Sequence, residues 1–497
     1  MVQFHSASVC SVLMLSLGTL AADNWPYQSF TTASWRVPKL SINETGDVGQ
    51  GYIFLALQGE QATPVGPTIY DGNGDLVYQG SHANASGFRV QNVSGQDMIT
   101  FWSGQYVDPG YGYGTVHILD NAYNELYTIT LKDNYITPDG QAKLSYLDAH
   151  GHFVTPWDTI LVPVVNITEY DLSAVGGQPD HYVANYLFYE IEVQSNDIVY
   201  SWSALDHIPI ELSEVDLAGT GTRELPFDPF QLNAINPTKD GFLVSLRGYS
   251  SVFSLNRDGS IRWQLSGING GDFELGEVNF SWQHDARVHD ETDESLSLSL
   301  FSNANTNRES DGESTAMILH VDLINRKVSA IRQVSDPDDP IHSKGEGSVQ
   351  LLDPATSHSH LLHLLVGYGD VPELKEYNGD GDVVLSAQFG HSGYIGSSSV
   401  SKSQWRATPF WKPTVQAKKI SDFAFDVYMS WNGATEYDNW AIYSVPSQDS
   451  DETTLVTSHK RDGFETRASI RVTDFSFIRV KARQGQVSLG VSDAIEL

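Results

Sequence analysis

The chain has 497 residues, of which 40% are hydrophobic and 11% aromatic, the composition of a folded globular protein rather than a disordered one. Its formal net charge is −33 and it has no basic run, so we expect no nucleic-acid partner. The same charge repels an anionic ligand at long range unless arginines reverse the potential locally.

The N-terminus is predicted to be a signal peptide over residues 1–22. An apolar run from Val9 to Ala22 ends in small residues suited to cleavage and is too short to span a bilayer. A buried first strand is the alternative. No later segment has the length of a membrane span, so none is expected. The only cysteine, Cys10, lies in this run, so the mature chain has no thiol for a disulfide, a metal site or a nucleophile.

Acceptor motifs for N-glycosylation occur five times after the signal peptide. A single motif means little, but five in such a chain indicate a eukaryotic secretory glycoprotein. We therefore expect a secreted protein, with the cell wall, the vacuole and the medium all open as its destination. The five predicted sites are Asn43, Asn84, Asn92, Asn166 and Asn279.

Short apolar stretches bounded by Gly, Asn and Asp fill the chain, which is the pattern of strands. A strand–turn–strand unit recurs six times, with turns near residues 73, 123, 196, 258, 325 and 380. Each copy fits the outer hairpin of one four-stranded blade. We predict an all-β fold: a β-propeller of six or seven four-stranded blades, forming one domain over residues 23–497. A row of β-sandwich domains is the alternative.

The two ends of this domain are less regular. The segment from Ser29 to Ser94 is predicted to form either blade strands or a small accessory β element at the N-terminus. The tail from Phe475 to Leu497 has the pattern of two strands, which we expect to close the ring.

In chain order, the first polar cluster is Asp148-Ala-His150-Gly-His152. Histidines at i and i+2 on a strand can share a metal. A surface histidine pair is the commoner case, so no metal is predicted here. No cofactor is predicted either. His150 remains a candidate for contact with a substrate.

The next cluster joins Gln231 and Asn233 to Arg247, which stands in an otherwise uncharged strand. An arginine in such a place usually has an anionic partner, either a structural carboxylate or a substrate. The densest cluster follows in Phe280–Val288. On a strand His284 faces one side, toward the propeller axis, while Asp285 and Arg287 share the other side and pair. A structural ion pair beside a packed histidine is the alternative.

Near the C-terminus, Trp431 and Asn432 are predicted to line a sugar or phenol pocket, or else to pack a blade. The chain lacks the motifs G-x-S-x-G and H-E-x-x-H and any phosphate-binding glycine loop. No motif therefore supports a serine hydrolase, a zinc protease or a nucleotide-binding enzyme.

Several of these strings together resemble the fungal branch of the arylsulfotransferase (ASST) family, from about residue 25 to the C-terminus. They are Trp282-Gln-His-Asp-Ala-Arg287, Asp148-Ala-His150 and Ser430-Trp-Asn-Gly-Ala-Thr-Glu436. The resemblance implies a propeller enzyme that moves a sulfuryl group between phenols through a sulfated histidine, without a nucleotide donor. Cationic donors near the axis would stabilise the charge of the transition state.

The resemblance also implies roles for individual residues. His284 would act as acid, base or donor to a sulfuryl oxygen, Arg247 and Arg287 would hold the anionic group, and His342 is the nearest candidate for the nucleophile. The remaining candidates would contact the substrate: Gln231, Asn233, Asp285, His150, Trp431 and Asn432.

The chain departs from the family pattern at two positions. Gln231 replaces the histidine of a D-x-x-H-x-N-S string, and Gly248 replaces that of an S-x-R-H string. Glutamine can supply neither a proton nor a positive charge. The first hypothesis is an arylsulfotransferase acting on a small phenol or aryl sulfate. The second is a catalytically degenerate propeller that binds a phenolic or glycan ligand in its central pocket. A third alternative is a propeller hydrolase that uses Asp148, His150 and a metal. The oligomeric state stays open.

Overall fold

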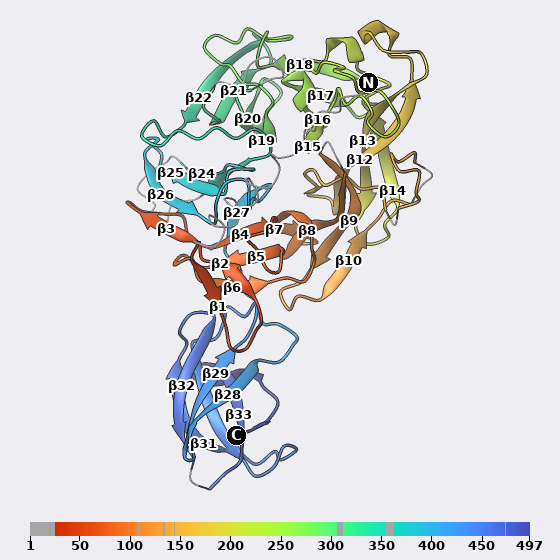
Figure 1. The fold of residues 1–497 in the computed structure, drawn as a ribbon. Helices are drawn as coiled ribbons and strands as arrows, with labels where there is room; N and C mark the ends of the chain where they lie inside the picture. Colours follow the sequence, from red (N-terminus) through yellow and green to blue (C-terminus); the bar gives the residue numbers. More distant parts are fainter. Residues whose placement is uncertain are drawn as a thin grey trace, which may run out of the picture.

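The computed structural model describes residues 25–107, 110–132, 135–143, 145–305, 312–352, 362–472 and 474–497. The predicted signal peptide therefore lies outside the described residues. Sheets surround a central axis, and a smaller unit lies beneath them (Figure 1). Strands dominate, together with three short 3₁₀ helices: η1 (Ser173–Val175), η2 (Ile210–Leu212) and η3 (Arg247–Tyr249). The predicted all-β propeller is confirmed, and the described residues form six blades.

The strands of the first three blades follow one another from the axis outward. Blade 1 contains β27 (Val400–Ser403), β4 (Tyr52–Leu57), β5 (Gly66–Tyr70) and β6 (Leu76–Gln79). Blade 2 contains β7 (Ala85–Val93), β8 (Gln96–Val107), β9 (Tyr111–Leu119) and β10 (Glu125–Ile129). Blade 3 contains β11 (Phe153–Val154), β12 (Thr159–Tyr170), β13 (His181–Glu192) and β14 (Ile198–Ser203).

The other three blades follow the same order. Blade 4 contains β15 (Leu232–Thr238), β16 (Gly241–Leu246), β17 (Ser251–Asn256) and β18 (Ile261–Ser266). Blade 5 contains β19 (His284–Glu291), β20 (Ser295–Ser302), β21 (Thr315–Asp322) and β22 (Lys327–Val334). Blade 6 contains β23 (Ser348–Leu352), β24 (His363–Gly367), β25 (Glu373–Tyr377), β26 (Val383–Gln388) and, at its outer edge, β3 (Ser41–Glu44).

The six predicted turns are the hairpins that join the third and fourth strands of the six blades. Each turn contains a residue with positive φ, as a tight hairpin requires. Three are glycines, which adopt this conformation freely, and Tyr123 and Asn196 adopt it with φ of 64° and 61°. The periodic turn chemistry therefore sets the blade repeat.

The ring is closed by β27, which pairs with β4, so blade 1 combines strands from both ends of the propeller. Lys402 on β27 contacts the buried Glu376 of blade 6 at 3.0 Å, which ties the closing strand to its other neighbour. The prediction that Phe475–Leu497 closes the ring is wrong. The strands of that tail pair with β30 and with each other.

Residues from 414 onward form two sheets outside the six blades, an addition to the single domain expected over residues 23–497. One sheet contains β28 (Thr414–Ser421), β29 (Ala424–Ser430) and β32 (Glu465–Arg471). The other contains β31 (Thr454–Lys460), β30 (Asn439–Val445), β33 (Phe477–Gln484), β34 (Val487–Val491) and β35 (Ile495–Glu496). Most of the segment Ser29–Ser94 forms blade strands, from β3 to β7, which is the first of the two predicted alternatives. Only its beginning forms a separate element, in which β2 (Arg36–Pro38) pairs with β1 (Tyr27–Ser29).

The hydrophobic core lies between neighbouring blades. Phe54 of blade 1 packs on Phe88 of blade 2 with ring centroids 5.3 Å apart, and Phe188 of blade 3 packs on Phe242 of blade 4 at 4.9 Å. Because a single blade cannot bury both faces, this packing between blades holds the inner strands in a ring. The ends of those strands consequently converge at the axis.

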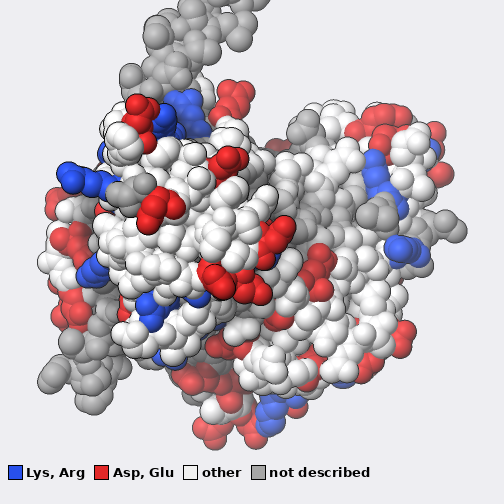
Figure 2. All heavy atoms as spheres, turned by 90° about the horizontal axis from the view of Figure 1, so that it is seen from below, with Lys and Arg blue, Asp and Glu red and all other residues white. Residues whose placement is uncertain are grey.

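The surface is acidic, and basic side chains are dispersed among the acidic ones on the face seen in Figure 2. Four of the predicted glycosylation sites are exposed: Asn43, Asn84, Asn92 and Asn279. The fifth, Asn166, is half-buried, and its side-chain oxygen accepts a hydrogen bond from the Ile136 backbone N–H. In the described part of the chain, no helix has the length and apolar character needed to cross a membrane.

Candidate functional site

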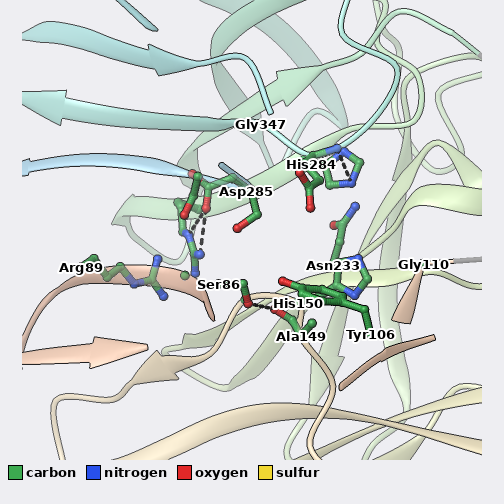
Figure 3. A pocket seen from close by; sticks show the side chains of 16 residues that line it. Ser86, Arg89, Tyr106, Gly110, Ala149, His150, Asn233, His284, Asp285 and Gly347 are labelled. Carbon is green, nitrogen blue, oxygen red and sulfur yellow. Dashed lines mark hydrogen bonds and ion pairs between the residues drawn. The ribbon is translucent and has the colours of Figure 1, made fainter. Parts of the chain in front are cut away.

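Two adjoining cavities at the axis form one central pocket. They share five lining residues, Gly110, His150, Asn233, His284 and Glu346. Most lining residues begin an innermost strand or directly precede one, so all six blades contribute to the walls (Figure 3). Of the predicted residues, His150, Gln231, Asn233, Arg247, His284, Asp285 and Arg287 line this pocket.

His284 begins β19 and is buried at the pocket wall. Its Nδ1–H donates to Asn303 Oδ1 at 2.7 Å, and the Asn303 amide donates to two backbone carbonyls, which fixes its oxygen toward the imidazole. Burial and the charge of Arg247 lower the pKa of His284 to about 3. The imidazole is therefore neutral near pH 7, and its Nε2 accepts a hydrogen bond from the Glu346 backbone N–H at 3.3 Å.

His150 has the opposite electrostatic environment in the same pocket. Its Nδ1 donates to Asp148 Oδ2 at 2.6 Å, and Asp148 is itself held by the Gly112 backbone N–H at 2.6 Å. Burial lowers the pKa of His150, but the charge and hydrogen bond of Asp148, with the charges of Glu346 and Asp228, produce a net rise. His150 therefore keeps its proton to a higher pH than His284 does.

Arg247 lies on η3, and its guanidinium stacks on the Trp282 ring at 3.7 Å and donates to Gln231 Oε1 and to Lys344 O. Gln231 and Trp282 hold φ values of 51° and 47°, which non-glycine residues rarely adopt. Burial is the main reason that the pKa of Arg247 falls to about 10, so the group stays cationic at neutral pH. Gln231 therefore positions this arginine.

Asp228 adds a buried carboxyl to the pocket. Burial raises the pKa of Asp228 to about 7, against the opposing effects of Gln231, His150 and Arg247. Its Oδ1 has no hydrogen-bond partner among the described residues. The carboxyl can therefore hold or release a proton near neutral pH.

The predicted pairing of Asp285 with Arg287 is confirmed. Arg287 Nε and Nη2 each lie 2.8 Å from Asp285 Oδ1, and Asp285 Oδ2 accepts from the Val349 backbone N–H at 3.0 Å. The register of β19 shifts between His284 and Arg287, and Asp285 has φ of 50°. This irregularity, rather than simple strand alternation, brings His284 and Arg287 to the same cavity.

Three predicted residues lie elsewhere. His342 is exposed, contacts the Gly312 carbonyl and does not line the pocket. Trp431 is buried in the core of the C-terminal unit. Asn432 makes two hydrogen bonds to the Gln79 backbone, at 2.9 and 3.0 Å. The prediction of a sugar or phenol pocket at Trp431 and Asn432 is wrong, because they pack and join the two units.

Sequence reasoning missed Arg89, Asp228 and Glu346, all of which line the pocket. Asp228 begins the string that contains Gln231 and Asn233, so its spacing was a usable signal. Arg89 comes from blade 2, far from the other candidates in sequence, and no local pattern marks it. Glu346 precedes β23 of blade 6 and follows the candidate His342 by four residues.

The comparisons with known proteins concern the family and the fold. The model of the family described as arylsulfotransferase (ASST) matches residues 89–390, more than half of the chain. None of the curated proteins with which the chain was compared matches it.

Solved structures with some likeness include a mutant GH43 protein BlXynB from Bacillus licheniformis, with 9% identity and a TM-score of 0.30 over 84% of this chain and 90% of that one. Another is the Penicillium chrysogenum alpha-L-arabinanase complexed with arabinobiose, with 10% identity and a TM-score of 0.34 over 78% and 94%. Such low scores carry no argument about activity. The family match covers more than half of the chain, including the blades that contribute His150, Asn233, His284 and Glu346. The chain therefore belongs to the arylsulfotransferase family.

Proposed function

We propose that the protein transfers a sulfuryl group from an aryl sulfate to a phenol, with His284 as the nucleophile. The observation that carries this proposal is the opposite protonation of two imidazoles in one pocket. Environments that separate the pKa values of neighbouring groups assign them different roles. The neutral His284 offers Nε2 as a nucleophile when a substrate displaces the 3.3 Å hydrogen bond from the Glu346 N–H, and His150, with its raised pKa, offers a proton.

In the first step, His284 Nε2 attacks sulfur, an N–S bond forms and the S–O bond to the aryl group breaks. The leaving phenolate takes the proton from His150. In the second step, the acceptor phenol attacks sulfur, the N–S bond breaks and the phenolic proton returns to His150. Both imidazoles end in their starting states, so the cycle needs no cofactor and no nucleotide.

Arg247 supports these steps by its charge. Its guanidinium faces the pocket shared with His284 and is held by Gln231 and Trp282. Sulfuryl transfer spreads negative charge over the equatorial oxygens, and a fixed cation stabilises that charge more effectively in a buried site than in water. Loss of the family's histidine at position 231 is therefore compatible with activity, since the glutamine fixes the cation.

The test uses a chromogenic aryl sulfate with a phenol acceptor. We expect ping-pong kinetics, and we expect His284→Ala to lower turnover roughly 10³-fold, as removal of a nucleophile does in other covalent mechanisms. His320→Ala is the matched control, since His320 lies on β21 and does not line the pocket. Turnover equal in His284→Ala and wild type would refute the assignment. A rise in Tm with aryl sulfate but no turnover would support the ligand-binding alternative instead.

We further propose that the chain is a secreted glycoprotein of the fungal branch of the family. The support is the apolar run before residue 23, the exposure of four of the five acceptor asparagines and the strings that resemble that branch. Expression in a eukaryotic host should place the protein in the medium, and enzymatic removal of N-glycans should lower its apparent mass. Retention in the cell without a mass change would contradict this proposal.

A further inference from the structure

Two arginines from different sides of the ring meet in the axial pocket. Arg89 lies on β7 of blade 2 and Arg287 on β19 of blade 5. Both line the cavity of His284 and also the adjoining cavity between β7, β19, β23 and β27. Figure 3 shows Arg89 on one side of the pocket and His284 and Asn233 on the other. Arg89 therefore lies across the pocket from His284.

The carboxylate in this region does not neutralise both cations. Asp285 uses one oxygen for Arg287 and the other for the Val349 backbone N–H. Arg89 donates to a backbone carbonyl, that of His152, and the described residues give it no carboxylate partner. Burial and the charge of Arg287 lower the pKa of Arg89 to about 9, so it remains cationic at neutral pH. Glu346 also lines the cavity of His284, but burial raises its pKa, and the charges that act on Arg89 are those of Arg287 and Asp285. Two positive charges thus face one negative charge at the arginine pair.

The neighbouring histidines do not change this balance. His152 and His289 both have lowered pKa values, first through burial, and Arg287 contributes to both. They are therefore neutral near pH 7. In a chain with net charge −33, the arginine pair produces a local positive potential at the axis.

Several buried donors in this region have no acceptor. Within the described residues, Arg89 Nε, Arg287 Nη1 and Ser398 Oγ are buried without a hydrogen-bond partner. All three side chains line the same cavity. An unsatisfied buried donor costs about 1–3 kcal/mol, and more when charged, so three in one cavity call for an acceptor.

We propose that Arg89, Arg287 and Ser398 form a binding site for a tetrahedral oxyanion, inorganic sulfate or phosphate, beside the histidine pocket. Such an anion accepts several charge-assisted hydrogen bonds and neutralises the excess charge. Arginine suits this task because its planar guanidinium matches oxyanion geometry. This site does not require that sulfuryl transfer takes place at His284.

The test is calorimetric titration of the full chain with sodium sulfate, with phosphate in a second arm, at constant ionic strength set by chloride. We expect saturable binding with one anion per chain. Arg89→Met should weaken it roughly 10- to 100-fold. Arg471→Met, the same change on the exposed surface of β32, should leave it unchanged. No saturable binding, or equal affinities for the two variants, would overturn the proposal.

Asp285→Asn gives an independent check, because it removes the negative charge and releases Arg287. We expect tighter sulfate binding, whereas a purely structural ion pair predicts no gain. His284→Ala separates this site from the proposed reaction: it should lose turnover and retain sulfate affinity. If His284→Ala loses turnover but the wild type binds no sulfate, the oxyanion site is refuted and the role of His284 is not. If His284→Ala retains turnover and sulfate still binds, the assignment of His284 as the nucleophile is refuted and the oxyanion site is not.

Discussion

His284 donates a 2.7 Å hydrogen bond to Asn303, and this contact decides which imidazole nitrogen faces the pocket. Asn303 directly follows β20, and its amide N–H groups donate to Ser343 O and Glu346 O at 3.2 Å each. The amide oxygen is therefore fixed toward Nδ1 and can only accept. Nδ1 keeps the proton, and Nε2 keeps the lone pair that a nucleophile needs.

Replacement of Asn303 by aspartate tests this relationship. A carboxylate beside Nδ1 favours the imidazolium, so the pKa of His284 should rise from about 3. Protonated His284 is not a nucleophile, and the acid side of the pH–rate profile should move to higher pH. Misplacement of the imidazole should also lower turnover at the optimum, by up to roughly 10²-fold. The measurement is kcat/KM as a function of pH.

Asn305→Asp is the matched control for this prediction. Asn305 is a neighbouring buried amide that donates to Asn303 O and Ser343 O and does not contact His284. Its substitution should leave the acid limb in place. An acid limb that is the same in Asn303→Asp and wild type would show that Asn303 does not set the state of His284.

The wild-type profile itself follows from the two imidazoles. His284 must be neutral, so activity should fall only as the pH approaches about 3. His150 must be protonated, so activity should fall as the pH rises through its raised pKa. Asp148→Asn removes the main cause of that rise and should move the alkaline limb to lower pH. An alkaline limb unaffected by Asp148→Asn would exclude His150 as the acid.

The fold was predictable because its repeat is local. Each blade carries its own hairpin with a residue of positive φ, such as Gly74 or Gly381, and these turns recur along the chain. The closing strand β27 was not predictable, since its four residues pair with β4 from the other end of the propeller. The C-terminal sheets were missed because their strands have the same alternating pattern as blade strands.

The site was predictable where its residues are close in sequence. His284, Asp285 and Arg287 share one strand, and Gln231 and Asn233 share another string. Arg89 reaches the pocket only through the closure of the ring, so the chain carries no local signal for it, whereas Glu346 lies four residues after the candidate His342. His342 was the nearest candidate for the nucleophile in the sequence, but the structure places that residue at an exposed position outside the pocket.

Asp228 should make stability depend on pH in a defined direction. Burial raises its pKa to about 7, above the value of about 3.9 for an unfolded chain. The folded state then binds the proton more tightly, so this group's contribution is present at low pH and is lost as the pH rises toward 7. Asp228→Asn should gain stability relative to wild type between pH 4 and 8, by up to about 4 kcal/mol.

Denaturant unfolding at several pH values gives the difference between the two proteins directly. Asp240→Asn is the control, because Asp240 is exposed and should not produce this trend. A stability difference between Asp228→Asn and wild type that stays constant with pH would show that Asp228 is ionised throughout the range.

Asn432 should matter for the joint between the propeller and the C-terminal unit and not for turnover. Its amide makes two hydrogen bonds to the backbone of Gln79 on β6, and the adjacent Gly433 N–H donates to Val77 O at 2.8 Å. Asn432→Ala removes both side-chain bonds and leaves the Gln79 groups unpaired, so the free energy of unfolding should fall by about 1–3 kcal/mol. Asn121→Ala, in the exposed β9–β10 turn, should cost less. Because Asn432 lies outside the axial pocket, kcat and KM of Asn432→Ala should stay at wild-type values. A loss of turnover with unchanged stability would show instead that Asn432 binds the substrate.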